Sequence, residues 1–247
     1  MTMAPNRYTW FLLLGLIALA FLARPAYGNV GEIGQIKGSG VLERDGDIVI
    51  EGNAGVGVQS MDEAVTANGT MRIDFVDETR VELTEQSRLV IDEFVYDPAN
   101  DVGSLSIKAS LGTVRYASGQ IAKKYKQNVK IRTPSATIGV RGTDFIMVVD
   151  EMGGSMITLL PSCDTAGMCY VGEIEVMTDA GFVVLNQAFQ ATQTVHGMRK
   201  PSPPVLLDLD EDQINNLLIL RKSDPIEEYN QQKMAERRKL ADFLGID

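Results

Sequence analysis

The sequence is poor in aromatic residues, histidine and cysteine, and each shortage argues against a class of function. Aromatic residues make up 6% of the 247 positions, which disfavours a binding face built on stacking against sugars or bases. The chain has a single histidine, His196, and two cysteines. Because protein zinc sites need several such ligands, we expect no metal. No phosphate loop and no Gly-x-Ser-x-Gly elbow occurs, so we also expect no cofactor and no catalysis.

Positive charge is scarce overall but concentrated in one span. The 23 Lys and Arg residues face 33 Asp and Glu residues, giving a net charge of −10. Nucleic acid is therefore not expected as a partner, because its affinity comes mainly from Lys and Arg on phosphates. From Arg115 to Thr143 the chain has no acidic residue. Six basic residues of this span are candidate contacts for an anionic envelope polymer or an envelope protein: Lys123, Lys124, Lys126, Lys130, Arg132 and Arg141. The alternative is that Lys123 to Lys126 only solvate a loop.

Only one long apolar run occurs, and it lies at the N-terminus. Residues 10–23 are apolar, Arg7 precedes them, and Ala26 and Gly28 supply small residues at a cleavage site. This pattern predicts a signal peptide over residues 1–28, cut after Gly28, and hence a periplasmic or secreted protein. An uncleaved anchor is the alternative, although a spanning helix needs about 20 residues. After cleavage no membrane span is expected.

The two cysteines, Cys163 and Cys169, stand close together in the sequence. In an exported chain this spacing predicts a local disulfide, because the compartment is oxidising. A redox-active pair usually has the spacing Cys-x-x-Cys, which is not seen here.

Short strands dominate the middle of the chain. Residues 72–75, 80–83 and 88–91 recur every eight positions with apolar residues at alternate places, which is the period of half-buried strands. Such a series forms either a β-meander or a stack of β-solenoid coils. Its arginines, Arg72, Arg80 and Arg88, would line up outside, as a binding ladder or as a solvated face with ion pairs.

Near residue 200 the spacing of apolar residues changes from the period of strands to that of helices. This change divides the chain into domains. We expect a β-domain over residues 29–200, built as a β-solenoid or a β-sandwich-like fold. A proline-rich linker follows over residues 201–207. The remaining residues, 208–247, show helix starts at Asp208 and at Asp224-Pro225 and predict an α-helical tail. The fold class is therefore all-β with a helical tail.

The most distinctive stretch is Thr133-Pro-Ser-Ala-Thr-Ile-Gly-Val-Arg-Gly-Thr-Asp-Phe145. Proline cannot donate a ladder hydrogen bond, so Pro134 belongs at a strand start or an edge. Gly139 suggests close approach by a neighbouring strand, and Gly142 suggests a positive φ. Arg141 and Asp144 could bond each other or capture carbonyls. We interpret the stretch as a structural corner, whose key residues are Thr133, Pro134, Gly139, Arg141, Gly142, Thr143 and Asp144.

This stretch closely resembles the hallmark of FecR domains, and its flanks resemble the family over roughly residues 55–195. The resemblance implies a periplasmic, β-rich, solenoid-like domain. In the namesake regulators this region senses an outer-membrane receptor and controls a cytoplasmic sigma factor through the membrane. Those regulators carry a sigma-binding region before a spanning helix, whereas only nine residues precede the apolar run here. We therefore expect a free, exported FecR-domain protein.

Three functions follow from these observations. The first is a non-catalytic envelope protein that binds or scaffolds through its β-domain and tail. The second is a signal-transfer component that acts with a separate membrane regulator of a sigma factor. The third, less favoured, is a β-solenoid enzyme acting on glycans. The sequence supports no prediction of the oligomeric state.

Overall fold

The computed structural model describes residues 28–163, 168–197 and 199–209, which form a β-fold with one α-helix, α2 (Gln120–Lys124), and one 3-10 helix, η1 (Lys126–Asn128). The all-β prediction is confirmed for this part of the chain. Apart from Gly28, the predicted signal peptide lies outside the described residues, as does the tail beyond residue 209. Within the described ranges, no helix has the length and apolar character needed to cross a membrane.

Two long strands, β4 (Glu63–Phe75) and β7 (Val102–Ala117), divide a 15-stranded sheet into two arms. The first half of β7 pairs with β6 (Arg88–Asp97) and with β8 (Val129–Arg132). Its second half pairs with β5 (Arg80–Leu83) and with β10 (Asp144–Val149). The first residues of β4 pair with β6, and its last residues pair with β5. Each long strand therefore belongs to both arms.

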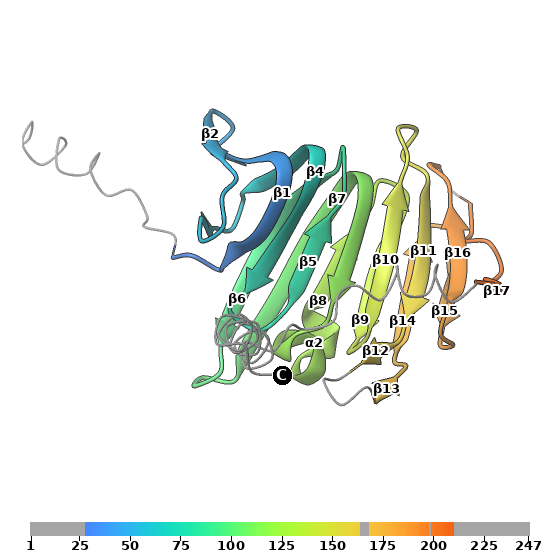
Figure 1. The fold of residues 1–247 in the computed structure, drawn as a ribbon. Helices are drawn as coiled ribbons and strands as arrows, with labels where there is room; N and C mark the ends of the chain where they lie inside the picture. Colours follow the sequence, from blue (N-terminus) through green and yellow to red (C-terminus); the bar gives the residue numbers. More distant parts are fainter. Residues whose placement is uncertain (1–27, 164–167, 198, 210–247) are drawn as a thin grey trace, which may run out of the picture.

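The two arms continue outward from β7 (Figure 1). One arm runs through β8, β9 (Thr137–Arg141), β14 (Glu173–Thr178) and β15 (Gly181–Leu185). The other arm runs through β10, β11 (Ser155–Leu160), β16 (Gln190–Thr194) and β17 (Val205–Leu206). Strand β1 (Gly31–Arg44) pairs with β4, β2 (Ile48–Glu51) and β3 (Gly57–Val58). Strands β12 (Ser162–Cys163) and β13 (Cys169–Tyr170) form a separate pair.

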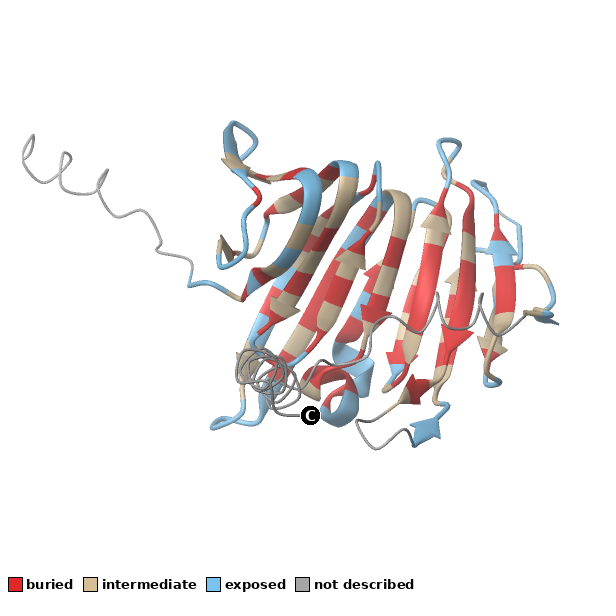
Figure 2. Cartoon of the chain, in the orientation of Figure 1, coloured by how far each residue is buried: buried red, intermediate tan, exposed pale blue. Residues whose placement is uncertain are grey.

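The core lies between the arms. Ile138, Val140 and Ile174 of one arm belong to the same buried cluster as Phe145 and Ile157 of the other. Buried and half-buried residues alternate along the strands, as Figure 2 shows. A two-layer arrangement in which long strands bend from one layer into the other is typical of β-sandwiches.

The predicted series of strands at eight-residue spacing is only partly realised. Residues 71–74 of β4 and 80–83 of β5 form an antiparallel hairpin, so the meander prediction holds for these two. The third strand, in β6, pairs with β7 and with the start of β4 instead. Apart from β7–β8, the ladders of the described sheet are antiparallel, so the parallel stacking of a solenoid is not seen.

This pairing also changes what the three arginines do. Arg72 and Arg80 both form ion pairs with Asp74, at 3.1 Å and 2.8 Å. Arg88 instead lies 3.0 Å from Glu63 of β4. The expected row of three arginines is therefore wrong, whereas the cross-strand ion pairs are confirmed.

The stretch expected as a linker lies on the sheet. Val205 and Leu206 form β17, which pairs with the start of β16. Thr192 donates its hydroxyl to the carbonyl of Ser202 at 2.6 Å, and Pro201 is buried. The described part of residues 201–207 therefore continues the β-fold.

Candidate functional site

The distinctive stretch begins as the turn of the β8–β9 hairpin. The Thr133 N–H donates to the Ala136 carbonyl at 2.9 Å, and the Ala136 N–H donates to the Thr133 hydroxyl at 3.1 Å. Pro134 lies inside this turn, just before β9, where no ladder hydrogen bond is required of it.

Hydroxyl groups attach this turn to the opposite arm. The Ser135 Oγ lies 2.9 Å from Ser155 Oγ of β11 and 2.7 Å from Thr194 Oγ1 of β16. Ser155 in turn donates to the Thr133 hydroxyl at 2.8 Å. The turn therefore links the two layers at one end of the sandwich.

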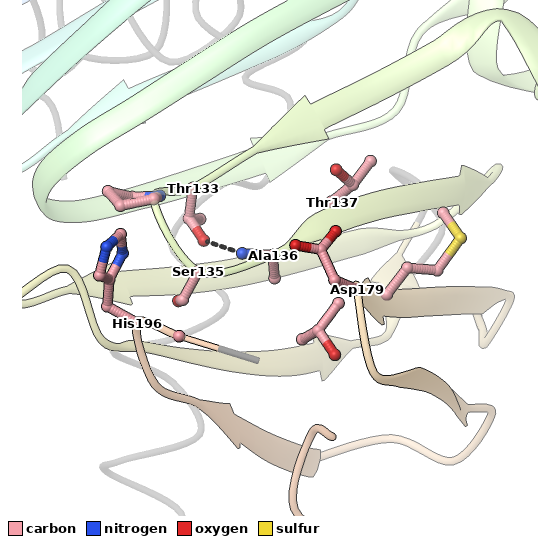
Figure 3. Close-up of a pocket in the computed structure, with 10 residues that line it drawn as sticks. Thr133, Ser135, Ala136, Thr137, Asp179 and His196 are labelled. Atoms are coloured by element: carbon pink, nitrogen blue, oxygen red, sulfur yellow. Dashed lines mark hydrogen bonds between the residues drawn. The ribbon is translucent and has the colours of Figure 1, made fainter. Parts of the chain in front are cut away.

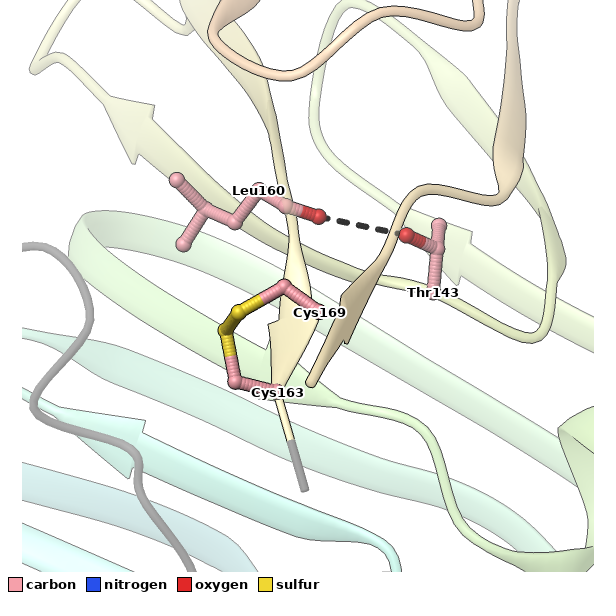
Figure 4. Close-up of a disulfide and its surroundings, with 4 residues drawn as sticks. All are labelled: Thr143, Leu160, Cys163 and Cys169. Atoms are coloured by element: carbon pink, nitrogen blue, oxygen red, sulfur yellow. Dashed lines mark hydrogen bonds between the residues drawn. A yellow bond between two sulfur atoms is a disulfide. The ribbon is translucent and has the colours of Figure 1, made fainter. Parts of the chain in front are cut away.

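The stretch ends at a corner where the chain leaves one arm for the other. Gly142 has φ 66°, as its predicted role requires. The buried Thr143 donates to the Leu160 carbonyl at 3.2 Å and accepts from the Gly172 N–H at 3.3 Å. The predicted disulfide, Cys163–Cys169, is present beside this corner (Figure 4).

Arg141 and Asp144 do not bond each other, contrary to one of the two roles suggested for them. Arg141 forms an ion pair with Glu173 at 2.8 Å, while Asp144 accepts from the Ser118 N–H at 3.1 Å. The reason is topological: Arg141 ends β9 in one arm, and Asp144 begins β10 in the other.

The prediction of close approach at Gly139 is also wrong. A Cβ built there would meet its nearest neighbours, atoms of Glu175 and Met177, only at 4.0 Å. Gly139 pairs with Lys130 on one side and with Glu175 on the other. Because glycine has no side chain, it forms the floor of an open hollow on the outer face.

We call this depression the Gly139 hollow; its volume is 380 Å³. Its lining residues come from η1, β8, β9 and β14: Lys126, Gln127, Val129, Lys130, Thr137, Gly139, Val140, Arg141, Glu175 and Met177. Lys126 and Lys130 stand on one side and Glu175 on the other. The hollow therefore has one basic rim and one acidic rim.

Of the six basic residues predicted as an anion-binding face, only half line the Gly139 hollow. Three of them, Lys126, Lys130 and Arg141, line the Gly139 hollow, whereas Lys123 and Lys124 are exposed on α2. Arg132 lies 3.1 Å from Asp92. A hydrogen bond from Lys108 is the main cause that lowers the pKa of Asp92, with smaller contributions from Ser106 and Arg132. Existing ion pairs thus occupy Arg132 and Arg141.

A second hollow of 540 Å³ lies at the end of the hairpin (Figure 3). It is lined by Thr133, Pro134, Ser135, Ala136, Thr137, Met177, Thr178, Asp179, His196 and Gly197. Figure 3 shows Asp179 near Ala136 and Thr137, with His196 away from them. The sequence did not indicate that Asp179 and His196 lie beside this turn, because both come from segments more than 40 residues downstream of Thr133. The two hollows share Thr137 and Met177.

The buried tyrosine of this region is structural. The Tyr116 hydroxyl has no hydrogen-bond partner of acceptable geometry, although Thr79 and Ser118 lie near it. Burial, followed by the negative charge of Asp77, raises its pKa well above the usual range. Such a group stays protonated and is a poor acid or base. In the parts of the chain that the structure covers, no group of three His, Cys, Asp or Glu side chains could hold a metal ion.

Part of the chain that lines the two hollows is similar to a known family. Residues 62–161 match the family model described as "FecR protein". No curated protein matches the chain. Two crystal structures of a candidate anti-sigma factor from Parabacteroides distasonis are similar at 14% identity, with TM-scores of 0.42 and 0.41. They cover 64% and 61% of this chain and 63% and 60% of the other, less than two thirds of its length.

Proposed function

We propose, from the match of residues 62–161 to the FecR family model, that the protein is a non-catalytic regulator in signal transduction that binds a partner protein. Two features support this. FecR domains of the namesake regulators relay the state of an envelope receptor to a sigma factor. The apolar N-terminal segment with its small-residue cleavage site is typical of an exported chain. Acting in the periplasm, the protein would pass its signal to a separate membrane regulator.

The observation that carries this proposal is the Gly139 hollow with its two charged rims. A polyanion would meet Lys126 and Lys130 favourably but would be repelled by Glu175 across the hollow. A protein surface can present both charges, and complementary pairs across an interface favour one orientation of the partner. A protein is therefore a better ligand for this face than an anionic polymer.

The floor of the hollow offers a substitution that should change binding without harming the fold. We expect Gly139→Leu to fold with unchanged or slightly higher stability, because the Cβ position is open. Glycine inside a strand costs about 0.5–1 kcal/mol relative to alanine. The leucine side chain would fill the hollow. Chemical unfolding of the variant and the unsubstituted protein measures the first effect.

Envelope extracts passed over the immobilised protein, with mass spectrometry of what is retained, test the function. We expect the unsubstituted chain to retain a partner protein. The retained amount of this protein should fall at least tenfold with Gly139→Leu and with Lys130→Glu. The matched controls are Gln193→Leu, at an exposed position of β16 on the other arm, and Lys37→Glu, at an exposed position of β1. Retention by the controls but loss with both hollow variants supports the proposal.

Two outcomes would contradict it. If every retained protein still binds the Gly139→Leu and Lys130→Glu variants, the hollow is not the binding face. If only anionic polymers are retained, and Lys130→Glu abolishes their binding, the ligand is a polymer and the protein-partner proposal fails.

A further inference from the structure

Strand β15 is the outermost described strand of the β8–β9–β14–β15 arm. Within the described residues β15 pairs with β14 and with no other strand. Its sequence, Gly181-Phe-Val-Val-Leu185, has no charge and no proline. The Phe182 side chain is 61% exposed. We infer that β15 pairs with β15 of a second copy of this chain, so that the arm continues from one molecule into the next.

The edge strand of the other arm, β17, has features that prevent edge-to-edge pairing. Strand β17 has only two residues, and Pro201, Pro203 and Pro204 precede it. Short edge strands and nearby prolines are common devices against edge-to-edge pairing, because proline cannot donate a ladder hydrogen bond. Strand β15 has neither device, and its residues are of the β-branched and aromatic types that suit a paired strand.

Both faces of β15 suit an added strand. On its outer face stand Phe182 and Val184, whereas Val183 and Leu185 face the core side. Leu185 is buried, but Val183 is only half-buried, since the core stops at this strand. An added strand with apolar residues at both faces would cover Val183 and extend the core.

The backbone of β15 is self-complementary about Val183. Strands β14 and β15 are joined by the two-residue turn Asp179–Ala180, so Thr178 and Gly181 form the closing hydrogen-bonded pair. By alternation, the N–H and C=O groups of Phe182 and Val184 point away from β14. An antiparallel copy with its two-fold axis at Val183 places Phe182 opposite Val184 of the partner. Each then donates and accepts one ladder bond, and an aromatic side chain lies beside a β-branched one.

One charged side chain, Lys200, lies beside Gly181 at the start of β15, a position that the proposed register places opposite Leu185 of the other copy. Asp179 is the nearest charged residue along the chain before β15, and the axis at Val183 places it opposite Gln187 of the other copy. A strand from an unrelated protein would need the same apolar pattern on both faces. A second copy supplies that pattern because its β15 has the same sequence. This inference is independent of the Gly139 hollow and of any partner bound there.

The expected association is weak. A five-residue edge buries less than the ~1,600 Å² of a standard interface, so we expect a dissociation constant of roughly 1–100 µM. Sedimentation equilibrium of the protein, purified as the cell produces it, measures this dissociation constant. We expect Val184→Lys to weaken dimerisation at least tenfold, because it adds two positive charges to the strand edge and removes the packing of each Val184 beside Phe182 of the other copy. Val95→Lys, at an exposed position of β6, is the matched control.

A cross-link tests the register directly. Val183 lies on the proposed axis as a non-hydrogen-bonded pair, with Cα atoms about 4.5 Å apart, within the range that a disulfide spans. Cys163 and Cys169 are already joined, so Val183→Cys introduces a single free thiol. We expect a covalent dimer with Val183→Cys and none with Val95→Cys. A monomer at all concentrations, a dimer unaffected by Val184→Lys, or no cross-link at Val183 would each overturn the inference.

Discussion

Replacing Phe145 with alanine is expected to destabilise the domain by about 3–5 kcal/mol, the usual cost of removing a buried phenylalanine. Phe145 is fully buried in β10, and its ring centroid lies 5.2 Å from that of Tyr116 in β7. The two residues are directly paired across the strands. The substitution leaves a cavity where β7 meets the second arm. Urea unfolding should show a lower midpoint with an unchanged slope.

The matched control removes one atom from the other ring. Tyr116→Phe deletes a buried hydroxyl that has no hydrogen-bond partner, so we expect unchanged stability or a gain of up to about 1 kcal/mol. If Tyr116→Phe proved as damaging as Phe145→Ala, the hydroxyl would have to bond within the folded protein. A loss below about 1 kcal/mol for Phe145→Ala would mean that the pair does not organise the core.

The strands themselves were largely predictable from the sequence, whereas their neighbours were not. Alternation at Ile138 and Val140 correctly indicates which side chains face inward. The period says nothing about which strand lies alongside. Strand β7 shows why: its two halves pair with different strands, and Gly112, with φ 85°, lies between them. The division into two arms therefore depends on long-range contacts that no local pattern contains.

The candidate site was also only partly predictable, because some of its residues meet through long-range strand pairing. The sequence pointed to Lys130 and to Gly139, which are adjacent across one hairpin. It did not point to Glu175, because that residue reaches Gly139 only through the pairing of β9 with the distant β14. A residue's charge is visible in the sequence, but its ion-pair partner is not. The same reason explains why Arg132 appeared available for an anion although Asp92 is beside it.

Long-range pairing also gives a buried acid a role that the sequence did not reveal. Asp77 stands between two of the predicted strands, residues 72–75 and 80–83. In the structure its carboxylate is buried and accepts from the Thr79 N–H at 3.0 Å, the Thr79 hydroxyl at 2.8 Å and the Ile121 N–H at 3.0 Å. The acid therefore holds the start of α2 against the β4–β5 turn, although 44 positions separate it from Ile121.

The second large effect is expected at Arg44, which lies at the end of β1. Its guanidinium binds the Asp62 carboxylate through two hydrogen bonds of 2.7 Å each and donates to the Gly57 carbonyl at 3.0 Å. Asp62 is fully buried, and its hydrogen bond is the main cause that raises the pKa of Arg44. We expect Arg44→Ala to cost about 3 kcal/mol in urea unfolding, because it leaves a buried carboxylate without its cation.

Two comparisons separate the ion pair from other effects of the substitution. Arg88→Ala removes an exposed arginine that lies 3.0 Å from Glu63, and exposed pairs contribute only about 0–1 kcal/mol. The double variant Arg44→Met/Asp62→Leu removes both charges and keeps apolar volume. We expect it to recover most of the stability lost in Arg44→Ala, since a buried pair replaced by apolar residues is often neutral. If the double variant is no more stable than Arg44→Ala, the loss does not come from the unpaired carboxylate. The Gln59 N–H, which donates to Asp62 at 2.8 Å, would then be the contact that the fold requires.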